Sequence, residues 1–515
     1  MIKKLCSLLL IPAALLGQQP PNIIYIMSDD HDADAISSYT NRLIQTPNID
    51  RLAKEGVRFT RAFVGNSICG PSRATLLTGQ HSHKNGMRDN HHPFDARQPT
   101  LLPIMHDAGY QTAVIGKWHL ESYPSGFDYW KILPGQGLYH DPRMISMNGD
   151  TAEVKGYTTD VITDEALRWL NRRRKDKPFI LLLHNKAPHR NFMPRLKYLS
   201  VFSEKTIPEP ASLYADMQTF GKARQQQRMR ILDDLTLCTD LKIDPEFLNG
   251  VPGLTIDSAD VKSYHSLMNR IPEKEREGLK KIYAERGKQF RQYHNDRKKL
   301  LALKYQWYMQ DYLSCVASVD ENVGRLLDYL DREQLTQNTV VAYTSDQGFY
   351  LGENGWFDKR WMYDVSLQIP LLIRWPAQVK PNTVNTTMVQ NIDFAPTFVD
   401  LAGKKVPNWM QGLSLLPLLK DNQKTLSRKY LYYHYYEYPI DHAVAPHLGI
   451  RGERYKLIYF YTLDEWELYD LQEDPNEEKN LAPQKEFAAV LKKMKEELIK
   501  ARDNYDDHEP AGQLH

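Results

Sequence analysis

The stretch Ile23-Ile24-Tyr25-Ile26-Met27-Ser28-Asp29-Asp30 is a short apolar run that ends in two carboxylates. Its apolar part is rich in β-branched and aromatic side chains and predicts a buried β-strand. Four further apolar runs lie along the chain, separated by segments with helical periodicity, and they cover residues 111–115, 179–183, 339–344 and 369–373. Strands that alternate with helices predict an α/β body with a largely parallel sheet.

Charged or imidazole side chains follow the first four of these runs. In open α/β sheets, ligands bind beyond the carboxyl ends of the strands. A single Asp-Asp or Asp-Gln pair is more often a turn or a helix cap, and a lone histidine is usually just hydrogen-bonded. The coincidence at four strand ends therefore favours one shared site. The side chains concerned are Asp29 and Asp30, then Lys117 and His119, then His184, Lys186 and His189, and finally Asp346 and Gln347.

The oxygen-bearing members of this set indicate a metal site. The carboxylates of Asp29, Asp30 and Asp346 and the amide oxygen of Gln347 make an all-oxygen group. Such a group suits a hard cation rather than zinc. We expect calcium, with magnesium as the second choice.

The composition indicates an ordinary globular chain with room for a large catalytic body and a smaller unit. It has 515 residues, of which 42% are hydrophobic and 25% charged, so a disordered chain and a membrane bundle are both excluded. Lys and Arg total 66 against 64 Asp and Glu. Because the charge is balanced, we expect no nucleic-acid partner, and an acidic substrate must be held by local charge.

The first 17 residues predict a secretory signal peptide. Lys3 and Lys4 precede an apolar run over residues 5–16, and the small residue Gly17 follows. A buried N-terminal helix is the alternative, and the lysine pair and Pro12 disfavour it. No later run reaches the roughly 18 apolar residues of a membrane span. We therefore expect an exported protein, periplasmic or secreted.

One of the cysteines has unusual neighbours. Beyond the N-terminal segment, Cys69, Cys238 and Cys315 are too few and too scattered for a disulfide framework or a zinc site. The segment Cys69-Gly70-Pro71-Ser72-Arg73-Ala74-Thr75-Leu76-Leu77-Thr78-Gly79 begins as a loop and continues as a helix with a glycine stop. A buried thiol before a helix is its plainest explanation. The full Cys-x-Pro-Ser-Arg pattern with Leu-Thr-Gly behind it, however, resembles the signature of type I sulfatases, in which the cysteine is oxidised to formylglycine.

The resemblance extends over nearly the whole chain after the signal peptide. Further segments look like motifs of this family and stand in the family's order: residues 116–119, 187–189, 345–348, 358–360, 393–403 and 467–482. The resemblance implies an alkaline-phosphatase-like fold, in which helices flank a mostly parallel central sheet. It also implies a catalytic domain over residues 18–420 and a smaller C-terminal domain over 421–515, with a short antiparallel sheet and a helix.

Two features depart from the family pattern. Gln347 stands where Asn is usual, which lengthens one metal ligand by a methylene. Residues from about 196 to 300 carry little family pattern and are rich in Lys, Arg, Glu and Gln. Their mixed charges predict a solvated helical insert rather than a nucleic-acid site.

The resemblance also implies roles for individual residues. Cys69 becomes the nucleophile after oxidation by a sulfatase-maturing enzyme, and the modified residue joins Asp29, Asp30, Asp346 and Gln347 around the cation. Arg73 and Lys117 balance the charge of the nucleophile. His119 removes the proton that releases sulfate. His189 and Lys359 bind the sulfate and protonate the leaving alcohol, and the choice of acid between these two stays open.

Substrate contacts are expected from two polar segments. Arg88, Asp89, Asn90, His91 and His92 follow the signature helix, and His442 and His447 follow an aromatic run. A solvated loop is nearly as plausible for the first segment. The motif set looks most similar to N-acetylglucosamine-6-sulfatases, which implies a 6-O-sulfated glucosamine in heparan-type glycans as substrate. Another glycan sulfate, a phosphodiester or phosphonate ester, and a non-catalytic sulfoglycan binder remain open.

Overall fold

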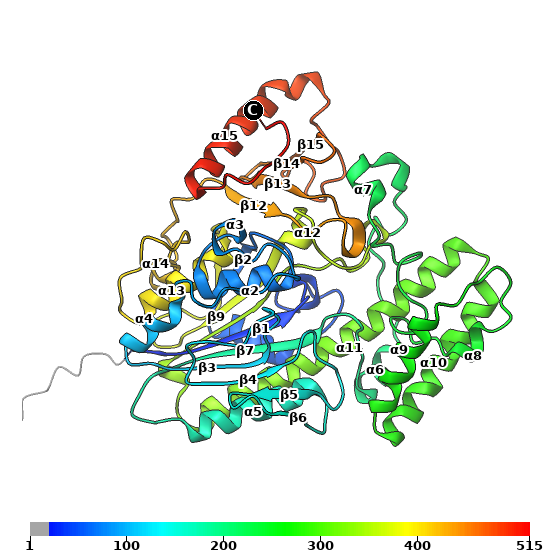
Figure 1. Cartoon of the computed structure of the whole chain (residues 1–515), viewed down its shortest axis with the longest axis horizontal. Helices are drawn as coiled ribbons and strands as arrows, with labels where there is room; N and C mark the ends of the chain where they lie inside the picture. Colours follow the sequence, from blue (N-terminus) through cyan, green and yellow to red (C-terminus); the bar gives the residue numbers. More distant parts are fainter. Residues whose placement is uncertain (1–19, 515) are drawn as a thin grey trace, which may run out of the picture.

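The computed structural model describes residues 20–514, and an eleven-stranded mixed sheet forms its centre (Figure 1). The predicted signal peptide lies outside the described residues. Ten strands follow the order β10-β2-β9-β8-β1-β7-β3-β4-β5-β6, and β11 also pairs with β2. The strands are β1 (Asn22–Asp29), β2 (Val57–Phe63), β3 (Gln111–Lys117), β4 (Tyr129–Leu133), β5 (Arg143–Ser146), β6 (Thr151–Glu153), β7 (Phe179–Pro188), β8 (Thr339–Ser345), β9 (Gln368–Arg374), β10 (Thr383–Asn385) and β11 (Val389–Gln390).

The first four predicted strands are confirmed, and they lie next to one another. Strand β1 is parallel to β8 on one side and to β7 on the other, and β7 is parallel to β3. Along β1, Ile24 and Ile26 join the core on one face of the sheet, whereas Tyr25 and Met27 join the core on the other. Because both faces are buried, the strand is apolar at every position rather than at alternate ones.

Helices cover both faces of this central sheet. The face of Ile24 packs against α1 (Pro47–Lys54), α5 (Thr158–Arg172) and the 36-residue helix α11 (Arg297–Arg332). The opposite face packs against α2 (Cys69–Thr78), α4 (Leu101–Asp107) and α13 (Phe394–Leu401). These layers confirm the predicted α/β architecture with a sheet enclosed between helices.

Antiparallel pairs flank the parallel centre of the sheet, whereas the outer strands β10 and β11 are parallel to β2. Strand β9 is the fifth predicted strand, and it runs antiparallel to both β8 and β2. At the other edge, β5 is antiparallel to β4 and to β6. The parallel part is therefore confined mainly to the centre, where the four strand ends with functional side chains meet.

A second sheet stands at the C-terminal end of the chain. Strands β12 (Leu431–Tyr435), β13 (His447–Arg451), β14 (Tyr455–Phe460) and β15 (Glu465–Asp470) are antiparallel, and α15 (Ala488–Tyr505) covers them (Figure 1). Tyr433 and Tyr435 face the catalytic body, whereas Tyr432 faces α15. The predicted antiparallel sheet with a helix is confirmed, and the domain boundary near residue 420 stays a prediction.

The expected helical insert over residues 196–300 is only partly helical. It contains α6 (Leu196–Phe202), α7 (Lys222–Gln226), α8 (Pro245–Leu248), α9 (Ser258–Arg270) and α10 (Glu273–Tyr293), but much of 203–257 is irregular. Pro208 and Pro210 interrupt helix formation there. The insert is also less solvated than expected, because Phe202, Leu241 and Ile243 are buried in the same core as the sheet.

The α-helices not yet described are short: α3 (Ser82–Asn85), α12 (Asp364–Leu367) and α14 (Leu416–Lys420). Within residues 20–514, none of the helices has the length and apolar character that crossing a bilayer requires. Cys69, Cys238 and Cys315 are all buried and unpaired with one another.

Candidate active site

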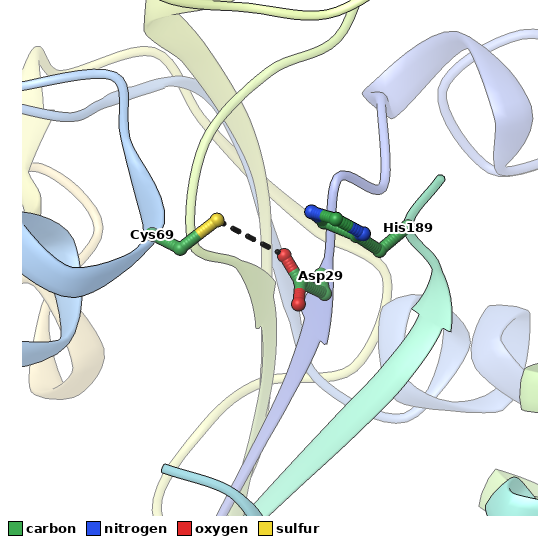
Figure 2. A group of neighbouring side chains, drawn as sticks. All are labelled: Asp29, Cys69 and His189. Atoms are coloured by element: carbon green, nitrogen blue, oxygen red, sulfur yellow. Dashed lines mark hydrogen bonds between the residues drawn. The ribbon is translucent and has the colours of Figure 1, made fainter. Parts of the chain in front are cut away.

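The predicted shared site exists at the carboxyl ends of the four central strands. Asp29 ends β1, Lys117 ends β3, His189 follows β7, and Asp346 follows β8. Cys69 reaches the same place as the first residue of α2. Figure 2 shows Cys69, Asp29 and His189 meeting from three separate elements, with the imidazole ring on one side of the carboxylate and the thiol on the other.

The Cys69 thiol is enclosed by polar side chains. Only 1% of the residue is exposed, and its Sγ lies 3.4 Å from Oδ1 of Asp29 and 3.8 Å from Nε2 of Gln347. Burial, followed by the negative charge of Asp29, raises the pKa of Cys69 to about 12. The glycine behind it allows close packing, because a Cβ at Gly70 would lie 2.6 Å from the Met87 side chain and 3.0 Å from Oδ1 of Asn90.

Three carboxylates converge beside this thiol. Oxygens of Asp29, Asp30 and Asp346 all lie within 4.8 Å of one another, and the three side chains are fully buried. Burial raises the pKa of Asp30 to about 7 and that of Asp346 to about 6, and the neighbouring carboxylates add to this effect. Burial alone would also raise the pKa of Asp29, but Lys117, His189 and Arg73 together hold it well below its usual range.

Three cations match these carboxylates. Nη2 of Arg73 donates to Oδ2 of Asp346 at 2.8 Å, and Nζ of Lys117 forms an ion pair with Asp29. The third is Lys359, whose Nζ contacts both oxygens of Asp30 at 2.7 and 2.8 Å. Because each cation is buried with its partner, removal of either member would leave an uncompensated charge in the interior.

The longer side chain of Gln347 reaches the carboxylate cluster. Its Nε2 donates to Oδ1 of Asp30, while Oε1 is buried and has no hydrogen-bond partner among the described residues. The two ends of an amide exchange places by a half-turn. Despite the extra methylene, Oε1 of Gln347 can therefore serve as an oxygen ligand beside Asp29, Asp30 and Asp346.

Two imidazoles border the cluster. Nε2 of His189 lies 3.7 Å from Oδ2 of Asp30, and its Nδ1 is 2.6 Å from the carbonyl oxygen of Arg190. His119 lies on the other strand end with a left-handed backbone (φ 52°), and burial followed by the charges of Lys117 and Arg73 lowers its pKa to about 2. Its Nδ1 is buried without a partner among the described residues.

Gln136, which no sequence motif predicts, also lies in the site. Its Oε1 accepts from Nζ of Lys117, and its Nε2 lies 3.2 Å from Nε2 of His119. No sequence signal singles out a glutamine in an ordinary glycine-rich loop. His184 and Lys186, predicted to follow the third strand, lie within β7. Nδ1 of His184 is 3.1 Å from the carbonyl oxygen of Lys117, and Nζ of Lys186 lies over the Tyr139 ring at 4.9 Å.

The segment from Arg88 to His92 lies beside the signature helix. Asn90 has the most direct link, because its Oδ1 accepts from the Gly70 N–H at 2.9 Å and its own N–H donates to Glu437. The other members point elsewhere or to solvent: Arg88 pairs with Glu509, Asp89 binds the backbone N–H groups of His91 and His92, and both of these histidines are exposed.

The structure separates the two later histidines. Nε2 of His442 lies 3.3 Å from Oδ2 of Asp358, the neighbour of Lys359, so this ring borders the site. His447 does not reach it: the residue is fully buried in β13, with Nδ1 near the Ala445 carbonyl and Nε2 accepting from the Met362 N–H. His447 faces inward in its strand, and both ring nitrogens are engaged, so it has no atom left for a substrate.

These features define the class of the protein. It is an α/β enzyme with a cation-rich site at the strand ends, built around a cysteine at the start of a helix. The chain belongs to the sulfatase family: the family model described as Sulfatase matches residues 21–404. A second model, described as N-sulphoglucosamine sulphohydrolase, C-terminal, matches residues 352–504. The predicted family, fold and sulfuric ester hydrolase activity are confirmed.

Individual relatives refine this assignment. The N-acetylglucosamine-6-O-sulfatase of Bacteroides thetaiotaomicron is 45% identical over 498 residues, which covers 95% of this chain and 88% of the relative. A protein solved in complex with its substrate D-glucosamine-2-N,6-O-disulfate matches with a TM-score of 0.91 and 45% identity, over 96% of this chain and 100% of the other. The phosphonate monoester hydrolase of Agrobacterium radiobacter shares the fold alone, at 21% identity and a TM-score of 0.69 over 94% and 96% of the two chains.

The inward position of His447 predicts a measurable pH effect on stability. Burial lowers its pKa to about 3, whereas an imidazole in an unfolded chain titrates near pH 6.5. A lowered folded-state pKa means that the stabilisation is complete above pH 6.5 and is lost as the pH falls toward 3. We expect His447→Gln to reduce the loss of unfolding free energy between pH 7 and pH 5 by about 2 kcal/mol. Urea unfolding of both proteins at the two pH values measures this, and parallel losses would contradict it.

Proposed function

We propose that this sulfatase removes the 6-O-sulfate from glucosamine residues, N-acetylated or N-sulfated, in fragments of heparan-type glycosaminoglycans. The observation that carries the proposal is the 45% identity, over 96% of this chain, to the protein whose solved complex holds D-glucosamine-2-N,6-O-disulfate. The same level of identity to an N-acetylglucosamine-6-O-sulfatase supports it. We also propose that the protein is exported, periplasmic or secreted, which suits a substrate as large as a glycosaminoglycan fragment.

Cys69 is the nucleophile in the proposed reaction, after its oxidation to formylglycine by a maturing enzyme. The hydrated aldehyde supplies two hydroxyls on one carbon, so that one can attack sulfur and the other can later release the sulfate. The position of Cys69 supports this role, since its Sγ lies 3.4 Å from Oδ1 of Asp29, at the edge of the carboxylate cluster. Arg73, one turn further along α2, keeps its guanidinium on the same carboxylate cluster.

The carboxylate cluster fits a divalent cation, for which we propose calcium. The donors are all oxygen, which matches calcium and magnesium better than zinc. Two observations support the fit: the raised pKa values of Asp30 and Asp346, and the buried Oε1 of Gln347 without a partner. Asp29, Asp30, Asp346 and Gln347 would hold the ion together with the modified Cys69, and the ion would offset the charge of the sulfate oxygens.

A lysine and an imidazole flank the position proposed for the sulfate, and burial lowers the pKa of the His189 imidazole well below its usual value. Lys359 and His189 both approach Asp30, at 2.8 and 3.7 Å from its Oδ2, and thereby define one side of the site. We propose that these two groups bind the sulfate and deliver a proton to the departing sugar oxygen. On the opposite side, His119 and Lys117 share Gln136, and His119 takes the proton whose loss releases sulfate.

Recognition of the sugar is assigned to the side chains at the mouth of this site. Asn90, His91 and His442 remain candidates, because Asn90 contacts the Cys69 helix and His442 contacts the neighbour of Lys359. His91 lies close to them, 4.0 Å from Glu437. Arg88, Asp89 and His92 are less directly placed, and His447 is withdrawn from the proposed contacts because it is buried.

Replacement of Cys69 tests the mechanism. We expect Cys69→Ala to abolish turnover while the protein stays folded, because no other described side chain takes this position. Cys69→Ser should be inactive or should trap a sulfated enzyme, since a serine offers a single hydroxyl. Steady-state kinetics measures the turnover, and mass spectrometry of the peptide that contains position 69 detects a modified or sulfated side chain. Activity within about tenfold of wild type, a barrier change of only about 1.4 kcal/mol, would contradict the formylglycine scheme.

Removal of a cluster carboxylate tests the cation site. We expect Asp29→Ala and Asp346→Ala each to lose the bound divalent ion and to lower turnover at least about 100-fold, because the remaining carboxylates and the sulfate then repel one another. Elemental analysis of the purified proteins gives the ion content. Asp328→Ala, at an exposed acid of α11, is the matched control. Active wild-type protein without a divalent metal would reject the site.

A panel of defined substrates tests the specificity. We expect the highest kcat/KM on 6-O-sulfated N-acetylglucosamine or N-sulfoglucosamine, and much lower values on galactosamine-4-sulfate and on 2-O-sulfated uronic acid. Activity confined to either of these last two would overturn the 6-O assignment and leave the sulfatase activity standing. An aryl phosphodiester in the same panel tests the alternative of a phosphodiester or phosphonate ester hydrolase, and a higher kcat/KM on it than on every sulfated sugar would favour that alternative.

A further inference from the structure

The ring of His189 is oriented by the loop that carries it. Nδ1 of His189 lies 2.6 Å from the carbonyl oxygen of Arg190, and the carbonyl of His189 itself accepts from the Tyr139 hydroxyl at 2.6 Å. These contacts leave Nε2 directed toward Asp30. Figure 2 shows the ring beside the neighbouring Asp29. The aim of this imidazole therefore depends on where the Arg190 peptide is held.

The Arg190 side chain is fixed by an aspartate of the insert. Nε and Nη2 of Arg190 donate to the two oxygens of Asp240 at 2.9 and 2.6 Å. Asp240 is buried and also accepts from the Thr236 N–H and hydroxyl, both at 2.9 Å, and from Nδ2 of Asn191 at 3.2 Å. A two-pronged pair of this kind fixes the guanidinium in one orientation.

The next part of the same loop is held by a lysine of the insert. Nζ of Lys242 donates to the carbonyl oxygens of Asn191, Phe192 and Asp240, the last two at 3.1 and 2.7 Å. The lysine is buried, and its charge is matched by Asp311 of α11 at 3.2 Å. Arg286 of α10 in turn grips Asp311 with two hydrogen bonds at 2.8 and 2.9 Å.

We infer that Asp240 and Lys242, two residues of the insert, are positioning residues that set the aim of His189 in the desulfation reaction. The inference rests on the proposed function, in which His189 acts on the sulfate or the leaving oxygen. A buried ion pair often contributes little net stability compared with a packed apolar pair, whereas a two-pronged arginine–carboxylate contact adds geometric specificity. Displacement of a reacting group by about 1 Å can cost on the order of 100-fold in rate, so such a clamp has a direct use.

A double-mutant cycle distinguishes positioning from general stability. We expect Asp240→Asn to lower kcat/KM on a 6-O-sulfated glucosamine about tenfold or more in the wild-type background, but less than about twofold in a His189→Asn background. Asp240→Asn should also change the same parameter, kcat or KM, that His189→Asn changes. Asp233→Asn is the matched control, because Asp233 is an insert acid whose ion pairs within residues 20–514 are with the surface arginines Arg230 and Arg297.

Equal losses in the two backgrounds, or a wild-type rate for Asp240→Asn, would overturn the inference. A wild-type rate for His189→Asn would instead reject the role of His189 in the proposed function. If Asp240→Asn does not fold, Arg190→Lys enters the same cycle with the same expected result, because it removes the two-pronged contact from the partly exposed side of the pair. If His189→Asn turns over too slowly to measure, a crystal structure of Asp240→Asn or Arg190→Lys decides. A His189 ring that stays in place beside Asp30 in that structure would overturn the positioning role.

Discussion

The burial of three carboxylates in one place is the constraint on which the rest of this structure depends. Asp29, Asp30 and Asp346 stand at the ends of neighbouring parallel strands, fully removed from water, with oxygens within 4.8 Å of one another. Carboxylates this close repel one another strongly in a low-dielectric interior. The arrangement can persist only if cations are delivered to the same point, and the fold delivers them from other elements.

The topology explains how those cations arrive. Lys117 comes from the end of β3 and Arg73 from the first turn and a half of α2, while Lys359 comes from the loop between β8 and β9. Only a sheet in which β8, β1, β7 and β3 are adjacent and parallel brings their carboxyl ends to one edge. Strands β9 and β5 do not share in this, since they run in the opposite direction and their carboxyl ends lie at the other side of the sheet. The chemistry thus occupies the parallel centre, and the edges serve packing.

The side chains that line this site could be predicted from the sequence because they stand in local patterns. Apolar runs that end in Asp29, Lys117, His189 and Asp346 identify strand ends, and the segment after Cys69 identifies a helix start. The supporting residues escaped prediction because their partners are distant in sequence: Gln136 is recognisable only once it bridges Lys117 and His119. His447 shows the opposite error, in which a suggestive residue type proved to be a strand position that faces the core.

The charge pattern of the insert predicted its environment only in part. The mixed charges over residues 196–300 predict a solvated segment, yet three of the charged side chains, Asp240, Lys242 and Arg286, are buried. A buried charge requires a partner: Asp240 pairs with Arg190 of the loop after β7, and both Lys242 and Arg286 pair with Asp311 of α11. A segment without family pattern can therefore still be tied to the candidate active site, because its buried charges are matched by residues outside the insert, and one of those, Arg190, lies next to His189.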